Sequence, residues 1–130
     1  MQGKIHRVYT PTNISPKPEK YEKIIAKVMA QYLKNNIRFI RRTCTTTPDI
    51  LAIELNQVWE IKNIRGNNKN TIARNLKGIY RQSENVVISL FRTKMTLDEA
   101  IAQTKKKLAN ANRLKRVVII SRDKKIVVIK

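Results

Sequence analysis

Two acids and a lysine in the segment PDILAIELNQVWEIK have the types and spacing of a metal-dependent phosphodiester site. Asp49 opens a short apolar stretch, and Glu60 and Lys62 belong to the next one. Side chains alternate between the two faces of a strand, so Glu60 and Lys62 share one face, and Trp59 and Ile61 share the other. Mg²⁺ prefers carboxylate oxygen and keeps several waters. We therefore predict a Mg²⁺ or Mn²⁺ ion held by Asp49, Glu60 and the backbone carbonyl of Ile61.

Cleavage of a phosphodiester needs charge neutralisation, an activated water and help for the leaving oxygen, and one or two metal ions can provide all three. Lys62 would face the same phosphate and could orient or deprotonate water if its pKa were lowered. Glu22, on the edge of an apolar helix face, could approach as an outer ligand or as a base, with Glu19 as its competitor. The predicted catalytic set is Glu22, Asp49, Glu60 and Lys62. The alternative is an exposed strand face beside a turn residue.

The elements that position these residues follow the order α-β-β-β-α-β-α-β-β, which predicts an α/β domain with a mixed sheet. Residues 1–16 have no periodicity and are expected to be a tail or linker, with the nuclease domain at 17–130. A first helix is expected to start at Ser15 and Pro16 to Pro18, with Glu19 in its first turn, and to end near Asn35-Asn36. Two more are expected from Thr71 to Gln82, with Tyr80 facing inward, and from the capping box at Thr96 to about Asn112. Strands are expected at 37–40, 49–55, 58–64, 86–91, 116–120 and 125–129, with a tight turn at Asn56-Gln57 and a polar loop at 66–70.

The composition of the chain limits which partners and mechanisms are possible. The chain has 130 residues, 28 basic and nine acidic side chains and a formal charge of +19, which favours a polyanion as partner. Its single cysteine, Cys44, excludes an intrachain disulfide and is expected to be a small semi-buried residue. Its single histidine, His6, excludes a paired-histidine ribonuclease mechanism. We see no apolar run long enough to span a membrane and no signal peptide.

At the Asp49, Glu60 and Lys62 positions the chain resembles the PD-(D/E)XK nuclease superfamily. A closer resemblance covers roughly residues 18–130, through YEKIIAKVMAQYL, PDILAIELNQVWEIKNI, GNNKNTIARNLKGIYRQSENVVISL and LKRVVIISRDKKIVVI. These segments are similar to the C-terminal toxin domains of contact-dependent growth-inhibition proteins, often tRNA nucleases, and to related polymorphic toxins.

The resemblance implies metal-dependent cleavage of RNA, most simply tRNA, after delivery from a producer cell into the target-cell cytoplasm. It also implies a cognate immunity protein, expected to be acidic, and leaves open a host factor needed for activity. Glu22, Asp49, Glu60 and Lys62 match the family's active-site positions. The residues expected to contact nucleic acid are Lys69, Arg74, Lys77, Arg81 and Gln82.

Two other functions remain open. Archaeal Holliday-junction resolvases are also small, basic and built on a Glu…PD…ExK pattern, so a DNA endonuclease is one alternative, together with toxin-type DNases. A non-catalytic nucleic-acid-binding module is the other, and it would bind through phosphate contacts with a steep salt dependence.

Overall fold

A computed structural model describes residues 5–110 and 113–130. In these residues the chain forms a mixed sheet of seven strands whose spatial order is the chain order, together with three α-helices and a short 3₁₀ turn. The elements are β1 (Val8–Tyr9), α1 (Lys20–Leu33), β2 (Ile37–Phe39), β3 (Ile50–Ala52), β4 (Gln57–Asn63), α2 (Thr71–Leu76), η1 (Ile79–Arg81), β5 (Asn85–Ser89), α3 (Leu97–Leu108), β6 (Arg116–Ile120) and β7 (Ile126–Val128). The α/β class with a mixed sheet is confirmed.

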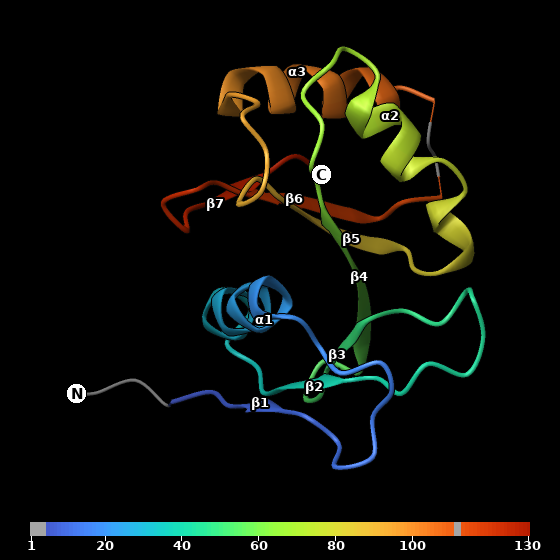
Figure 1. The fold of residues 1–130 in the computed structure, drawn as a ribbon, viewed down its shortest axis with the longest axis vertical. Coiled ribbons are helices and arrows are strands. Elements are labelled where there is room, and N and C mark those ends of the chain that lie inside the picture. Colours follow the sequence, from blue (N-terminus) through green and yellow to red (C-terminus); the bar gives the residue numbers. More distant parts are fainter. Residues whose placement is uncertain (1–4, 111–112) are drawn as a thin grey trace.

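The strand directions divide the sheet at β4. β2, β3 and β4 are antiparallel neighbours, whereas β4, β5 and β6 run parallel, and β7 returns antiparallel to β6. In Figure 1, α1 lies between the β1–β3 part and the β5–β7 part, and β4 connects the two parts. The two-residue strand β1 pairs in parallel with β2.

Two hydrophobic clusters lie on opposite faces of the central strands. One cluster joins α1 to Trp59 and Ile61 of β4 and to Val87 of β5. The other joins α2 and α3 to Ile88 of β5 and to its neighbours on β6. Successive side chains along each strand point to opposite faces, so they belong alternately to the two clusters. The parallel strands are therefore buried on both faces, as is typical of sheets covered by helices.

The helix expected at 71–82 is interrupted, which corrects one prediction. α2 ends at Leu76, Gly78 has a φ of 71°, and a 3₁₀ turn follows at Ile79. Glycine adopts this left-handed conformation without a Cβ penalty, so it ends the helix and redirects the chain. Ile79 stays buried, but Tyr80, expected to face inward, is 41% exposed.

The ends of other elements differ from expectation by a few residues. β3 is short, because residues 53–56 form the turn expected at Asn56-Gln57. The segment expected as a tail contributes β1 and places Ile14 in the α1 cluster. The apolar residues of this segment that pack against the core are isolated in the sequence, so they produce no periodic pattern. α3 ends at Leu108, with Ala109 as its C-cap, which is earlier than the end expected near Asn112, a residue outside the described ones. Within the described residues, no helix is long and apolar enough to cross a membrane.

Candidate active site

β4 separates its polar and apolar side chains as the sequence predicts. Trp59 and Ile61 are buried in the α1 cluster. Glu60 and Lys62 lie on the other face, where Lys62 Nζ is 3.6 Å from Glu60 Oε2. Glu60 is 3% exposed, so its carboxyl group lies in the wall of the protein and not on an open strand face.

Asp49 is held against β4 by its own side chain. Its Oδ2 accepts a hydrogen bond of 2.8 Å from the Ile61 amide, and its amide donates to the Trp59 carbonyl at 3.2 Å. β3 begins at Ile50, and the Asp49 carboxylate thus extends the pairing of β3 with β4 by a side-chain contact. This contact brings the carboxyl groups of Asp49 and Glu60 into one small region.

Burial and a neighbouring acid set the protonation of Glu60. Burial is the main cause that raises its pKa from 4.5 to about 8, and the hydrogen bond and charge of Asp49 act in the same direction. Lys62 opposes the shift without cancelling it. Two acids this close in a poorly solvated place cannot both ionise cheaply without a cation.

Glu22 approaches the pair from the first turn of α1. Burial raises its pKa, and the charges of Asp49 and Glu19 add to this, whereas the Glu19 amide and Arg42 lower it. Glu22 also has a structural role, because its Oε1 accepts a hydrogen bond of 3.0 Å from the Glu19 amide. Glu19, the competing residue, forms an ion pair with Arg92 at 3.6 Å. Electrostatic proximity to Asp49 therefore favours Glu22 over Glu19.

A small cavity of about 100 Å³ lies beside Glu22 and Asp49. Its other walls come from residues 14–18, from Phe39 and Ile40, and from Arg42 in the loop before β3. Arg42 is a cation near the acids that the sequence pattern alone does not single out. The sequence signal that could have placed Arg42 near the acids is its position shortly before Pro48-Asp49.

The residues present fit a divalent ion in one specific way. Glu60 Oε1 is buried and has no hydrogen-bond partner. Among the described residues no three histidine, cysteine or acidic side chains gather as a ready metal cage. The arrangement that would fit is a two-carboxylate site in which Asp49 and Glu60 would be the side-chain ligands and water would supply the remaining positions, as Mg²⁺ accepts.

The predicted nucleic-acid contacts do not form one cluster. Lys69 lines a groove between α2 and α3. Arg81 and Gln82 line a second groove beside the start of β4, and the Gln82 side-chain amide lies 3.4 Å from the Thr45 carbonyl in the loop before Asp49. Arg74 and Lys77 are exposed at the α2 end outside both grooves. Gln82 therefore contacts the loop that leads into Asp49.

Fold and site together define a small, strongly basic α/β domain with a buried glutamate, a half-buried aspartate and a lysine at the middle of its sheet. Residues 46–126 match the family model of the contact-dependent growth inhibition CdiA C-terminal domain. Since this match covers more than half of the chain, the protein belongs to that family.

A solved structure shares the whole fold. It is described as a CdiA-CT/CdiI toxin and immunity complex from Burkholderia pseudomallei, and the matched chain is similar to this one at 20% identity with a TM-score of 0.64. The likeness covers 95% of this chain and 98% of the other. Among curated proteins, none matches this sequence.

Proposed function

We propose that this domain is a metal-dependent endonuclease toxin that cleaves RNA, with tRNA as its substrate. The observation that carries the proposal is the buried Glu60 carboxyl group beside the half-buried Asp49, with Lys62 Nζ 3.6 Å from Glu60 Oε2. The Asp49 carboxylate also accepts the Ile61 amide hydrogen bond, but its position beside the poorly solvated Glu60 carboxyl group destabilises the metal-free fold. A cation at the site would turn that cost into binding energy.

Each side chain of the site has a different role in the proposed reaction. Asp49 and Glu60 hold the ion with the Ile61 carbonyl, and the bound ion supplies charge neutralisation at the phosphate and acidifies water. Lys62 lies at the edge of the acid pair with its side chain 26% exposed, so it can contact a phosphate oxygen from solvent. Glu22, with its raised pKa, can accept or hold a proton near Asp49.

The choice of RNA rests on the resemblance of the sequence to toxin domains that are often tRNA nucleases, while the charge suits the phosphate backbone of either nucleic acid. The domain carries a formal charge of +19, and its exposed cations suit a phosphate backbone. The structural neighbour is a toxin bound to an immunity protein. By extension, we propose that an acidic immunity protein neutralises this domain and that the domain acts inside the target cell.

The test is a cleavage assay with purified domain on total bacterial tRNA and, separately, on linear and junction DNA. Each reaction contains Mg²⁺, Mn²⁺ or EDTA. Asp49→Ala is the test variant, and Asp98→Ala is its matched control because Asp98 lies in the exposed first turn of α3. We expect discrete, metal-dependent tRNA cleavage that is lost in Asp49→Ala and kept in Asp98→Ala, with both variants folded.

Three results would contradict parts of the proposal. Cleavage of DNA alone would make the domain a DNase. Cleavage that survives Asp49→Ala would place the reaction elsewhere. Absence of cleavage of any substrate, with salt-dependent binding intact in Asp49→Ala, would favour a binding module.

A further inference from the structure

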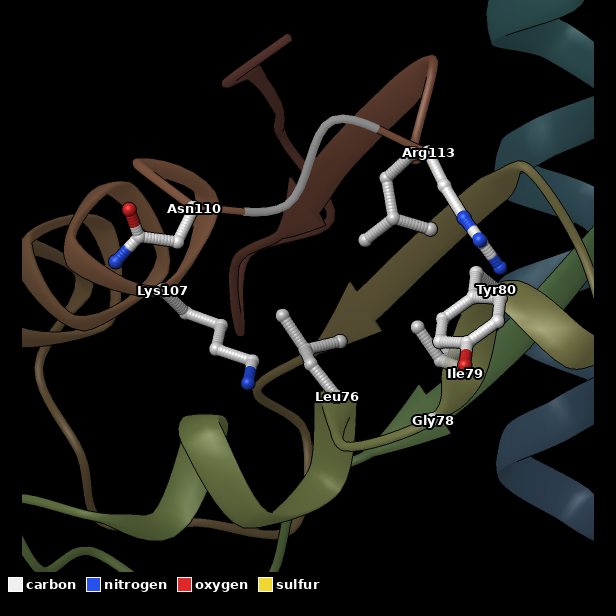
Figure 2. Close-up of a pocket in the computed structure, with 8 residues that line it drawn as sticks. Leu76, Gly78, Ile79, Tyr80, Lys107, Asn110 and Arg113 are labelled. Carbon is white, nitrogen blue, oxygen red and sulfur yellow. The ribbon is translucent and has the colours of Figure 1, made fainter.

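A groove of about 390 Å³ lies between the end of α2, η1 and the end of α3, on a different part of the surface from the acid pair. Figure 2 shows Lys107 and Asn110 on the α3 side and Tyr80 and Arg113 opposite, with Leu76 between them. We call this the η1 groove. Its volume falls in the range of pockets that bind small molecules.

The floor of the η1 groove is apolar and its rim is cationic. Leu76, Ile79 and Leu114 are almost fully buried and form the floor. Lys107 and Arg113 stand at the rim, and the described lining contains no acid. An apolar floor with a rim whose charged side chains are both cations suits a flat ring that carries an anionic group.

Tyr80 gives the groove an exposed aromatic wall. The Arg113 guanidinium carbon lies 4.6 Å from the centre of the Tyr80 ring, and that of Arg81 lies 5.7 Å away. Tyr80 is 41% exposed, so part of its ring faces solvent. Guanidinium groups stacked on an aromatic ring are pre-positioned for phosphate, and an exposed ring edge or face can contact a base.

Hydrogen bonds connect the segment after η1 to β4, the strand that carries Glu60. Directly after η1, Ser83 Oγ and Asn85 Nδ2 each donate a 2.9 Å hydrogen bond to the Val58 carbonyl. Val58 precedes Glu60 by two residues in β4. Arg81 and Tyr80 also line the adjacent groove that reaches Gln57 and Val58, so the two surfaces are continuous. A nucleic-acid strand bound in the η1 groove can therefore continue along the surface toward β4.

We propose that the η1 groove binds one splayed-out nucleotide of the RNA substrate. Its base lies on the floor formed by Leu76, Ile79 and Leu114 against Tyr80, and its phosphate lies between Lys107 and Arg113. Unpaired bases are what proteins read in RNA, because the grooves of duplex RNA hide the base edges. This inference rests on the proposed RNA-cleaving function for its choice of ligand.

The test measures binding separately from cleavage. The domain carries Glu60→Gln, is kept in EDTA, and is titrated into fluorescein-labelled single-stranded RNA and into the matching RNA duplex. Test variants are Tyr80→Ala and Arg113→Gln. Tyr32→Ala and Lys27→Gln are matched controls, because Tyr32 is 39% exposed and both residues lie on α1, outside the groove.

We expect each test variant to bind the single strand about tenfold more weakly, which corresponds to the loss of one stacked base or one charged phosphate contact. The duplex and the controls should change little. Tyr80→Phe should keep binding because it keeps the ring. Lys107→Gln should reduce the slope of log affinity against log salt by about 0.7, the value for one neutralised phosphate on a single strand.

Two outcomes would overturn the inference. One is unchanged single-strand affinity in both Tyr80→Ala and Arg113→Gln, with thermal unfolding that shows both folded. The other is intact RNA binding with lost immunity-protein binding, which would make the groove a protein interface. In the proposed nuclease, Tyr80→Ala should raise KM and leave kcat nearly unchanged, since the groove does not touch the reacting phosphate. Failure of cleavage in the wild-type domain would refute the proposed function while leaving the binding result readable.

Discussion

Glu60 should make the metal-free domain less stable as the pH rises, and replacing it with glutamine should remove that loss. The pKa of Glu60 is raised to about 8 in the folded protein from its ordinary value of 4.5. Between these two values the unfolded chain has released the Glu60 proton and the folded chain has kept it. The free energy of unfolding therefore falls as pH rises through this window, and the loss is complete above the folded pKa.

The size of the effect follows from the two pKa values. At pH 7 the unfolded chain gains about 3 kcal/mol more from ionising Glu60 than the folded chain does, at about 1.4 kcal/mol per pKa unit. Glutamine has the same shape, cannot ionise and can still donate to Asp49. Glu60→Gln should thus be more stable than the parent by about 3 kcal/mol at pH 7, or on the order of 10 °C in Tm. Near pH 4 the two proteins should be equally stable.

The assay is urea unfolding of both proteins in EDTA, repeated across this pH range. Glu84→Gln is the control, because Glu84 forms an exposed ion pair with Lys115 at 3.2 Å and such pairs contribute about 0–1 kcal/mol. Mg²⁺ should stabilise the parent and not Glu60→Gln, since a ligand that binds only the folded state adds to stability. A difference between parent and Glu60→Gln that does not change with pH would refute the reasoning.

Three further predictions concern single side chains outside the acid pair. Gly78→Ala should lower the free energy of unfolding by about 1–2 kcal/mol, because alanine is strained at a φ of 71°; urea unfolding with no change would contradict this. Glu54→Ala should cost about 1 kcal/mol and leave cleavage intact, because Glu54 Oε1 accepts a 2.6 Å hydrogen bond from the Asn36 amide and lies outside the site; lost cleavage in a folded variant would give it a catalytic role. Cys44 should react with iodoacetamide at half its maximal rate near pH 7, since the Thr46 and Thr47 hydroxyls lower its thiol pKa to about 7, and Thr46→Val should move that midpoint upward; an unchanged midpoint would refute this cause.

Local patterns predicted what depends on a few neighbouring residues. The alternation in VWEIK indicated which face of β4 carries Glu60 and Lys62, and the α1 cluster on Trp59 and Ile61 bears this out. The capping residue Thr96 was also predictable, because its side chain accepts from Glu99 within the same turn. Such features need only the period of the element and the chemistry of its ends.

Features set by distant parts of the chain were not predictable in the same way. The Asp49 bond to the Ile61 amide depends on the register of β3 against β4. The sequence interpretation of Cys44 as semi-buried is wrong, since it lies in an exposed threonine loop. The break at Gly78 had a visible signal in the glycine itself, but the apolar spacing through Ile79 and Tyr80 continued past it and suggested one helix.

The acids of this basic chain mostly have structural partners, which is why Glu60 stands out. Glu54 binds a backbone amide, Glu84 and Asp123 pair with lysines, and Glu99 accepts from the Gln103 side chain. Within the described residues, Glu60 Oε1 is the carboxylate oxygen that is buried without a partner. The protein carries a charge of +19, yet the ion pair with Lys62 leaves Glu60 Oε1 unpaired. An unpaired buried acceptor costs about 1–3 kcal/mol or more. A buried, unpaired carboxylate oxygen beside a second acid is typical of a site that a ligand completes. Adding metal and replacing Glu60 with glutamine therefore test the proposed function directly.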